Sequence, residues 1–206
     1  MTPRRGWFVT LEGPEGGGKT TQIGFLAKWF RDRGWEVVTT QEPGGEPLAN
    51  RIRELLLHTD GPISARTELL LYLAARAQHV ERVIRPALEA GKVVLCDRFA
   101  DSTMAYQGYA RGLDKGFVRG ANEFATGGLE PDLTIVIDIP VEKGLGRQMA
   151  RNRMEEESIE FHRKVRKGFL DIARDEPYRV VVVDGSADAE TVRKRIISVV
   201  EERFGK

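Results

Sequence analysis

The feature that most constrains this chain is a glycine-rich loop near the N-terminus that follows the pattern G-x-x-x-x-G-K-[ST]. In this pattern the glycines let several backbone amides turn inward around phosphate oxygens, the lysine supplies a mobile positive charge, and the hydroxyl of the next residue can bind Mg²⁺. The loop therefore predicts a site for a nucleoside triphosphate. The predicted binding residues are Gly13, Pro14, Glu15, Gly16, Gly17, Gly18, Lys19, Thr20 and Thr21.

The sequence around the loop supplies the setting that the pattern requires. An apolar run from Trp7 to Leu11 indicates a strand before the loop, and an apolar repeat after Lys19 indicates a helix whose positive end faces the phosphates. A glycine-rich turn without a ligand is the structural alternative, and this strand-loop-helix setting disfavours it.

Strands and helices are expected to alternate along the rest of the chain. Further strands are expected at 36–40, 92–96, 133–139 and 180–183, and helices at 19–33, 48–58, 69–88, 100–109, 117–126 and 189–204, with one more helix ending near 174. This alternation predicts an α/β fold of the P-loop NTPase type, with three α/β/α layers and a five-stranded parallel sheet. A length of 206 residues fits one domain.

The composition limits the partners and the compartment. Lys and Arg number 32 against 31 for Asp and Glu, so the net charge of +1 gives no electrostatic basis for nucleic-acid or membrane-surface binding. The single cysteine, Cys96, excludes an internal disulfide and fits a reducing compartment. The first apolar run is too short for a signal peptide or a membrane span. We therefore expect a cytoplasmic protein.

Asp97 and Arg98 follow an apolar stretch that is expected to form a buried strand. A carboxylate at the end of such a strand can hold a Mg²⁺ ion or its water, so Thr20 and Asp97 are the predicted metal residues. A strand-end Asp that caps the next helix is the simpler alternative. The guanidinium of Arg98 could bind the phosphate of an acceptor in bidentate fashion. With Lys19, these two residues are predicted catalytic groups of the phosphate site.

The long apolar helix expected at 69–88 carries Tyr72 and Arg76 four residues apart, on a face next to its apolar stripe. An aromatic plane and a guanidinium at this spacing can address the same spot, which suits a flat heterocycle. In the helix expected at 100–109, Ser102 and Tyr106 form a similar pair.

Arginines gather in a charged segment after the strand expected at 133–139. Arg147 and Arg151 share one face if the segment is helical, whereas Arg153 lies off that face. A flap at about 147–158 would exclude water and bring a catalytic arginine, either Arg151 or Arg153, to the transferring phosphoryl group. The alternative is a solvated helix in which the glutamates at 155–157 balance the charge.

Four stretches of the chain resemble one family, the bacterial thymidylate kinases. They are Leu11-Glu12-Gly13 leading into the loop, Glu42-Pro43-Gly44-Gly45, the run from Asp97-Arg98-Phe99 to Gly108-Tyr109, and Glu157-Ser158-Ile159-Glu160-Phe161-His162. The segment Ala105-Tyr106-Gln107-Gly108 is the most specific, because the phosphate loop alone is shared with many NTPases.

The resemblance implies that the γ-phosphate of ATP is transferred to dTMP with Mg²⁺, which gives dTDP for the synthesis of dTTP. It also implies a homodimer built on long helices. The acceptor residues that it implies are Glu15 at the sugar 3′-hydroxyl or the acceptor region, Arg53 and Arg98 at the phosphate, Ser102, Tyr72 stacked on thymine, Arg76 at its carbonyl oxygen, Tyr106 at the sugar 2′ position and Gln107 near the base.

Three features depart from the family's pattern. The flap stretch Ala150-Arg151-Asn152-Arg153-Met154 is shorter than is common and lacks the acidic residue often found before the second Arg. Gln41 stands where many bacterial relatives have Arg, and Phe99 replaces a usual Tyr and so removes a hydroxyl.

Two other functions would use the same phosphate loop. A GTPase switch would carry Asn-Lys-x-Asp and Asp-x-x-Gly, and neither pattern occurs in the chain. A kinase for another nucleoside monophosphate or for a deoxynucleoside is the remaining alternative.

Overall fold

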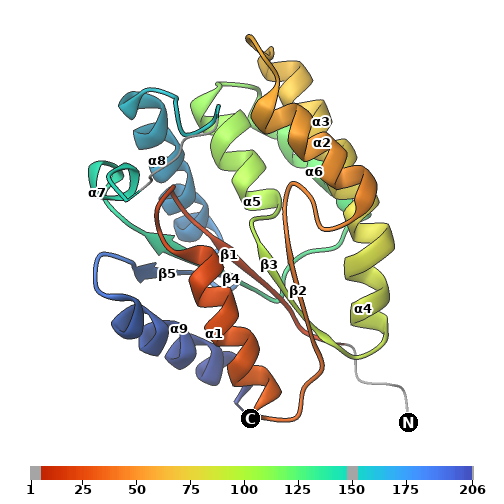
Figure 1. The fold of residues 1–206 in the computed structure, drawn as a ribbon, viewed down its shortest axis with the longest axis vertical. Helices are drawn as coiled ribbons and strands as arrows, with labels where there is room; N and C mark the ends of the chain where they lie inside the picture. Colours follow the sequence, from red (N-terminus) through yellow and green to blue (C-terminus); the bar gives the residue numbers. More distant parts are fainter. Residues whose placement is uncertain (1–5, 148–152, 206) are drawn as a thin grey trace.

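The computed structural model describes residues 6–147 and 153–205. Within these ranges five parallel strands form one sheet in the order β2-β3-β1-β4-β5 (Figure 1). The strands are β1 (Phe8–Glu12), β2 (Val37–Gln41), β3 (Val93–Asp97), β4 (Leu133–Asp138) and β5 (Val180–Asp184). Every residue of β1 is buried, as expected for a central parallel strand with helices on both faces. The predicted α/β fold with a five-stranded parallel sheet is confirmed.

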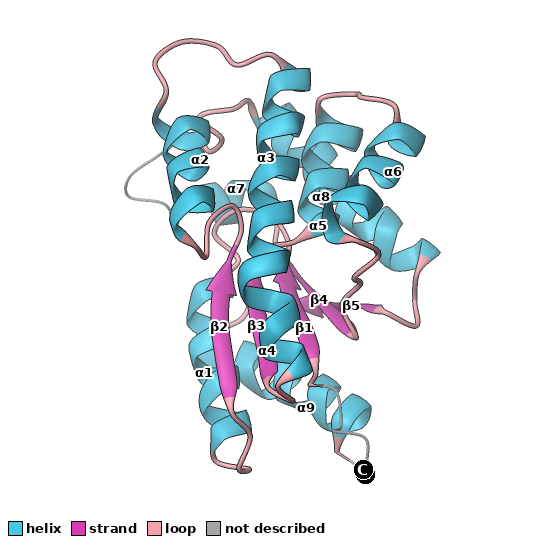
Figure 2. Cartoon of the chain, turned by 90° about the vertical axis from the view of Figure 1, so that its right-hand side faces the viewer, coloured by secondary structure: helices cyan, strands magenta, loops and turns pink. Residues whose placement is uncertain are grey.

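Helices cover both faces of this sheet (Figures 1 and 2). They are α1 (Lys19–Arg31), α2 (Pro47–His58), α3 (Ala65–His79), α4 (Arg85–Glu89), α5 (Ala100–Thr103), α6 (Lys115–Thr126), α7 (Val141–Leu145), α8 (Ile159–Asp175) and α9 (Ala189–Phe204). α1 and α9 share one hydrophobic core with the sheet, through residues such as Leu26 and Ile196. α3, α6 and α8 form the core of the opposite face, through residues such as Leu69, Val118 and Phe169.

Local chemistry explains where several helices begin. The side chains of Ser64, Asp114, Ser158 and Asp188 each accept a hydrogen bond from a backbone amide three residues further on, which caps α3, α6, α8 and α9. The last helix has the bounds expected from the sequence. Gly34 takes a left-handed conformation, with φ of 82°, just beyond α1, as its predicted position at the helix end requires.

The long helix expected at 69–88 is interrupted. α3 passes into a π-helical turn at Val80–Ile84 before α4 continues. Pro86 has no N–H to donate, and its ring would clash with a carbonyl of the preceding α-helical turn, so the wider turn accommodates it. The helix expected at 100–109 likewise becomes a π-helix at Met104–Ala110. Spacing alone could not separate these turns from α-helix, because the apolar stripe is similar in both.

Two further differences flank the charged segment. α7 was not expected, and α8 begins at Ile159, within a stretch that was expected to precede a helix. Ser158 caps α8 by accepting a hydrogen bond from the Phe161 amide at 3.1 Å.

The C-terminal ends of all five described strands meet at one edge of the sheet, where open parallel sheets bind their ligands.

Candidate active site

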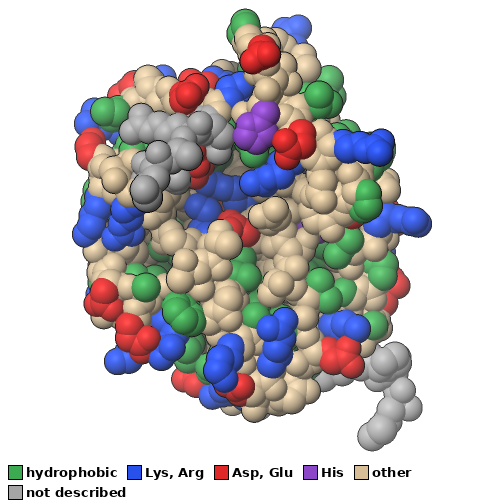
Figure 3. Space-filling model, viewed as in Figure 1, with side chains coloured by type: hydrophobic (Ala, Val, Ile, Leu, Met, Phe, Trp, Pro, Cys, Tyr) green, Lys and Arg blue, Asp and Glu red, His purple; other side chains and the backbone are tan. Residues whose placement is uncertain are grey.

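A cleft of about 610 Å³ lies at this edge of the sheet. Figure 3 shows Lys and Arg side chains gathered in a hollow on the face seen in Figure 1. The cleft is lined by most of the residues predicted from the sequence: Glu15, Gly16, Gly17, Gly18, Lys19, Thr20, Thr21, Arg53, Tyr72, Arg76, Asp97, Arg98, Ser102, Tyr106 and Gln107. The fold thus brings together groups that lie as much as 92 residues apart in the chain, from residue 15 to residue 107.

The phosphate loop is held by its own lysine. Nζ of Lys19 donates hydrogen bonds to the carbonyl oxygens of Gly13 at 3.2 Å and Pro14 at 2.9 Å. These two residues do not line the cleft, and they contribute to the loop through these carbonyls. Burial lowers the pKa of Lys19, and the neighbouring Arg98 guanidinium lowers it further. A lysine tied to carbonyl oxygens in this way is available to a stronger anionic partner such as a phosphate.

The loop also touches the start of the segment that leads to the predicted flap. A side chain on Gly16 would place its Cβ 2.0 Å from the carbonyl oxygen of Gly144, and one on Gly144 would approach the carbonyl oxygen of Glu15 to 2.2 Å. The two backbones can approach this closely only because both positions are glycine. Arg147, just after α7, donates to the carbonyl oxygen of Gly16 at 3.2 Å and lines the cleft.

Thr20 and Asp97 are the two residues predicted to hold a metal. Oγ1 of Thr20 donates to Oδ2 of Asp97 at 2.6 Å, although 77 residues separate them. Among residues 6–147 and 153–205 no group of three or more His, Cys, Asp or Glu side chains forms a metal site. One hydroxyl with one carboxylate suits Mg²⁺, which binds few protein oxygens and completes its shell with phosphates and water.

Arg98 occupies the centre of the cleft. Its NH1 donates to the carbonyl of Gly13 at 3.2 Å and to Oγ of Ser102 at 3.0 Å, and its NH2 donates to Oε1 of Glu15 at 2.7 Å. Its φ of 71° is left-handed, the only such value among the non-glycine residues that the structure describes. Strain of this kind persists where the surrounding contacts require it, and it clusters at functional sites.

Glu15 joins Arg98 to Tyr106. Its Oε1 also accepts a hydrogen bond from the Tyr106 hydroxyl at 2.6 Å. Burial alone would raise the pKa of Glu15, but the charges of Arg98 and Lys19 and the bond from Tyr106 outweigh it and lower that pKa to about 2. The Tyr106 ring is further held edge-on by Phe161 and Phe169. Glu15 is therefore ionised and Tyr106 is fixed in place.

Glu12 holds the segment that follows Arg98 in the chain, and it was not recognised as a site residue from the sequence. Its Oε1 accepts from the Phe99 amide at 2.7 Å and the Ser102 amide at 3.3 Å, and its Oε2 accepts from the Ser102 hydroxyl at 2.6 Å. Burial, reinforced by the charge of Asp101, raises the pKa of Glu12 to about 7. The Ser102 hydroxyl thus links Glu12 to the guanidinium of Arg98.

Arg76 is almost completely buried, with 2 % of its surface exposed. Its Nε donates to Glu42 at 2.8 Å, its NH1 to Thr103 and Asn122, and its NH2 to the Phe99 carbonyl at 3.0 Å. These bonds use four of the five N–H groups of the guanidinium, so among the described residues one N–H of NH2 is without a partner. Arg76 is thus fixed in direction by the protein while it lines the cleft.

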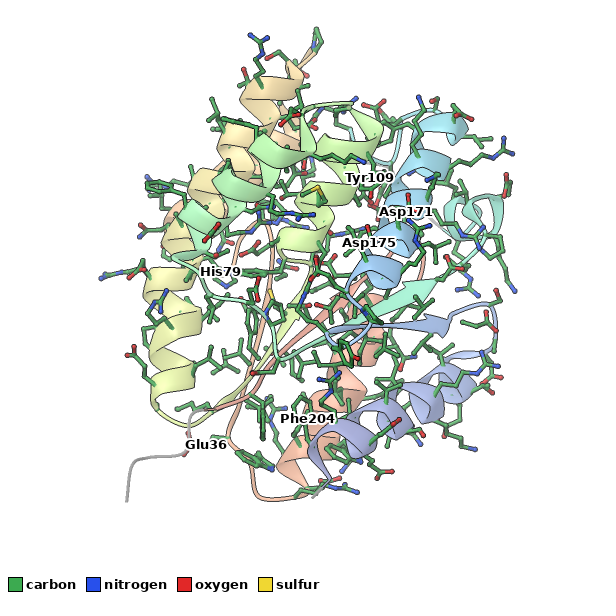
Figure 4. The ribbon with its side chains drawn as sticks, turned by 180° about the vertical axis from the view of Figure 1, so that it is seen from behind. Glu36, His79, Tyr109, Asp171, Asp175 and Phe204 are labelled. Carbon is green, nitrogen blue, oxygen red and sulfur yellow. The ribbon has the colours of Figure 1, made fainter. Side chains whose placement is uncertain are left out.

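His79 lies on α3 one turn beyond Arg76 (Figure 4). It belongs to the same buried network. Its Nδ1 lies 3.0 Å from Oε1 of Glu42, and its Nε2 lies 2.7 Å from Oγ1 of Thr40. A Cβ on Gly45 would meet Nε2 of His79 at 2.4 Å, so the loop after β2 packs directly on this ring. Glu42 therefore fixes both this loop and α3.

Tyr72 and Gln107 face the cleft from α3 and from the π-helix after α5. Burial raises the pKa of Tyr72 to about 12, so its ring is neutral. Nε2 of Gln107 donates to Oε1 of Glu68 at 2.8 Å. Arg53, from α2, donates to the carbonyl of Pro43 at 2.8 Å.

The predicted flap arginines are placed differently from one another. Arg151 lies outside the described residues. Arg153 donates to the carbonyl of Leu56 at 2.9 Å and to Oε2 of Glu68 at 2.6 Å, and it does not line the cleft. Its guanidinium therefore serves an ion pair in this conformation. Arg147, which the sequence placed on the same charged segment, does line the cleft.

Sequence reasoning missed three buried carboxylates that organise the site: Glu12, Glu42 and Glu68. The first two lie in stretches that carry the family resemblance, Leu11-Glu12-Gly13 and Glu42-Pro43-Gly44-Gly45, which was the available signal for them. Glu68 precedes the apolar stripe of α3 and resembles an ordinary helix-start acid, so only the tertiary structure reveals its partners.

Comparisons with known proteins agree with this geometry. A family model described as thymidylate kinase matches residues 11–196. A thymidylate kinase of Syntrophotalea carbinolica is 52% identical over 200 residues, covering 92% of this chain and 93% of the relative. One of Synechococcus sp. (strain JA-2-3B'a(2-13)) is 54% identical over 197 residues, covering 96% and 95%.

Solved structures point the same way. A crystal structure of thymidylate kinase from Ehrlichia chaffeensis superposes with a TM-score of 0.81 at 34% identity, covering 95% of this chain and 99% of that one. Identity near one half over almost the whole chain, together with the matched fold, leads to one conclusion. The chain belongs to the thymidylate kinase family.

Proposed function

We propose that the cleft binds ATP and dTMP at opposite ends and lines up their phosphates for direct transfer. The chain phosphorylates dTMP with ATP as co-substrate, giving dTDP, as its family membership indicates. The observation that carries the two-substrate arrangement is that the phosphate loop and the Arg98–Glu15 pair, 2.7 Å between NH2 and Oε1, line the same cleft. Phosphoryl transfer needs mainly positioning and charge neutralisation, and this cleft offers both.

On the donor side, the loop amides and Lys19 hold the β- and γ-phosphates of ATP, and α1 directs its positive end at them. Thr20 and Asp97, which already lie within hydrogen-bond distance, are the residues that would hold Mg²⁺. The ion, when bound, neutralises negative charge on the transferring phosphoryl group. Lys19 leaves the carbonyls of Gly13 and Pro14 for the stronger anionic partner.

On the acceptor side, Arg98 binds the phosphate of dTMP, with Arg53 beside it. The ionised carboxylate of Glu15 accepts a hydrogen bond from the sugar 3′-hydroxyl. Tyr106, anchored to Glu15 at 2.6 Å, crowds the 2′ position and disfavours ribonucleotides. Ser102 keeps the guanidinium of Arg98 directed into the cleft.

The base is recognised on the α3 side. Tyr72 offers a neutral ring for stacking on thymine. The remaining N–H of Arg76 donates to a carbonyl oxygen of the base, and the other four hold the guanidinium in that direction. Gln107 lies beside the base from the π-helix.

A flap at about 147–158 closes over the transferring group and supplies one catalytic arginine, Arg151 or Arg153. In support, Arg147 at the start of this segment contacts the phosphate loop. Because Arg153 is paired with Glu68, its use in catalysis requires that this ion pair open. We favour Arg151 for this reason.

We propose one nucleoside monophosphate kinase domain over residues 1–206, working in the cytoplasm as a homodimer. In support of a dimer, α2, α3 and α6 pack together and leave Leu55, Leu70 and Phe124 exposed by 53%, 61% and 90%. Within the described part of the chain, no helix has the length and apolar character to cross a membrane.

The substrate assignment is tested by measuring ADP formation from Mg-ATP with a panel of nucleosides and nucleoside monophosphates. We expect the highest kcat/KM with dTMP, a lower value with dUMP, and little turnover with dCMP, UMP or thymidine. A kinase for another monophosphate or for a deoxynucleoside is the alternative, which the comparisons do not favour. Equal turnover of dTMP and dCMP would refute the proposed base recognition.

A further inference from the structure

Glu68 is a fully buried carboxylate in the first turn of α3, with none of its surface exposed. It lies behind the cleft and is not among the residues that line it. Its Oε1 accepts from Nε2 of Gln107 at 2.8 Å and from Nε of Arg111 at 3.1 Å. Its Oε2 accepts from NH2 of Arg111 at 3.1 Å and from NH2 of Arg153 at 2.6 Å. Both oxygens are therefore saturated with donors.

These partners keep Glu68 ionised. Burial alone would raise the pKa of Glu68, but the hydrogen bonds from Arg111, Gln107 and Arg153 outweigh it and lower that pKa. An ionised carboxylate accepts hydrogen bonds and donates none. Gln107 must therefore present its NH2 group to Glu68, so the orientation of the Gln107 amide follows from the chemistry of its partner.

The opposite end of the same amide is directed away from Glu68. Gln107 lines the cleft from a nearly buried position, with 1% of its surface exposed. Its Oε1 accepts no hydrogen bond from any residue that the structure describes. The atom is also not among the fully enclosed side-chain atoms without a partner in the described residues, so it is open to the cleft. This oxygen is thus an open acceptor on the wall that also carries Tyr72 and Arg76.

An open acceptor discriminates between pyrimidines at N3. Thymine and uracil carry a hydrogen on N3 and can donate it, whereas N3 of cytosine has a lone pair that would face the Gln107 oxygen. The remaining N–H of Arg76 complements this pattern, because thymine and uracil present a carbonyl oxygen at C4 where cytosine presents an amino group. A site built to receive a hydrogen bond rejects a ligand that leaves its polar group unpaired.

We infer that Glu68 is a specificity-determining positioning residue: it holds the Gln107 amide with its oxygen toward the base, so that the cleft accepts 4-keto pyrimidines and rejects cytosine. This inference rests on the proposed function of the cleft. It adds a residue that touches no substrate and acts through Gln107.

Glu68 also has a structural task, which the test must separate from this one. It bonds Arg153 of the flap segment and Arg111, and Arg111 pairs with Glu157 at 2.5 Å. Loss of the charge at Glu68 will therefore loosen this part of the molecule and lower stability. A general loosening changes kcat/KM for every acceptor alike, whereas a turned Gln107 amide changes the ranking of the bases.

The test is Glu68→Gln in the full chain, with kcat/KM measured for dTMP, dUMP and dCMP under saturating Mg-ATP. The amide that this substitution introduces can donate as well as accept, so Gln107 is free to turn its NH2 group toward N3 of cytosine. We expect the ratio of kcat/KM for dTMP over dCMP to fall by about tenfold or more. The ratio for dTMP over dUMP should stay within about twofold, because both bases donate from N3.

Arg111→Gln is the matched control. It removes a charged partner of the same carboxylate but leaves the bond between Glu68 and Gln107 in place. We expect Arg111→Gln to lower the melting temperature while both acceptor ratios keep their wild-type values. A parallel fall of kcat/KM for all three acceptors in Glu68→Gln would show that Glu68 is structural only, and would overturn the inference.

A double variant tests the route of action. If Glu68 acts through Gln107, then Glu68→Gln has no further effect on the dTMP to dCMP ratio in a Gln107→Leu background. A further fall in that background would overturn the inference. Should Glu68→Gln fold too poorly to assay, Glu68→Asp withdraws the carboxylate by one methylene and is measured for the same ratios. If the wild-type enzyme shows no preference for dTMP over dCMP, the proposed base recognition itself is refuted. The results with the variants bear only on the role of Glu68.

Discussion

The hydroxyl of Thr20 donates a hydrogen bond of 2.6 Å to Oδ2 of Asp97, which joins the first turn of α1 to the end of β3. Because β1 lies beside β3 in the sheet, the phosphate loop and this carboxylate are held on one edge by the fold itself.

This pair gives the first prediction, for Asp97→Asn. The substitution retains the size of the side chain and removes the charge that would attract Mg²⁺. We expect kcat to fall by about a hundredfold and the Mg²⁺ concentration for half-maximal rate to rise, while the KM for dTMP changes little. Thr20→Val should show a smaller shift in the same direction. An unchanged Mg²⁺ requirement in both variants would exclude this pair as the metal site.

The second prediction concerns discrimination against ribonucleotides. In Tyr106→Phe the ring remains packed on Phe161 and Phe169, but the hydroxyl that anchors it to Glu15 is lost. We expect kcat/KM for UMP to rise relative to dUMP, and to rise further in Tyr106→Ala. Tyr109→Phe is the control, since Tyr109 does not line the cleft. A ratio that stays constant across the three variants would show that Tyr106 does not contact the sugar.

The third prediction is the effect of pH on stability through Glu12. Its pKa is raised to about 7 in the folded protein, so the fold favours the protonated carboxyl. The stability that protonated Glu12 contributes is complete below about pH 4.5 and is lost as the pH rises through about 7. The side chain in Glu12→Gln stays neutral at every pH. The free energy of unfolding of this variant minus that of the wild type should therefore increase between pH 5 and pH 8, by on the order of 3 kcal/mol.

Denaturant unfolding of both proteins across this pH range measures that difference. Other titrating groups, such as His162 with its lowered pKa, are common to both proteins and cancel in the comparison. A difference in stability that stays constant with pH would mean that Glu12 is ionised throughout the range.

The fourth prediction assigns the flap arginine. We expect Arg151→Ala to lower kcat by about a thousandfold with little change in the KM for dTMP. Arg153→Ala should have a smaller effect on kcat and should lower the melting temperature, because Arg153 holds Glu68 and the Leu56 carbonyl. Lys164→Ala on α8 serves as a charge-matched control. If all three variants turn over at the wild-type rate, the flap supplies no catalytic arginine.

The fifth prediction concerns assembly. Leu70 on α3 and Phe124 on α6 are exposed apolar side chains on helices that pack together. We expect the wild type to sediment as a dimer at micromolar concentration and the double variant Leu70→Glu/Phe124→Glu to sediment as a monomer. Tyr178→Glu, at another exposed aromatic position, should leave the dimer intact. A wild type that sediments as a monomer would refute the proposed interface.

Much of this architecture could be predicted from the sequence because its signals are local. The phosphate loop depends on glycines at fixed spacing, and α9 shows the amphipathic repeat and the capping Asp188 that set its bounds. Asp97 could be placed at the cleft because the ends of parallel strands share one edge.

What could not be predicted depends on contacts between distant segments. A buried carboxylate such as Glu68 looks in the sequence like a solvated helix-start acid, because its partners Gln107 and Arg153 lie 39 and 85 residues away. The same is true of Arg76: its place near the base was expected, but the network that consumes four of its N–H groups was not. The π-helical turns could not be predicted because they alter hydrogen bonding without altering which residues are apolar.

The contact between Gly16 and Gly144 has a consequence for how this enzyme can vary. Since neither position has room for a Cβ, the phosphate loop and α7 are in direct backbone contact, so a movement of the proposed flap that leaves the loop in place would begin after residue 144. A methyl group added at Gly144, a residue that does not line the cleft, would press on the backbone at Glu15. A substitution at Gly144 would thus lower nucleotide affinity although this residue does not contact the nucleotide site.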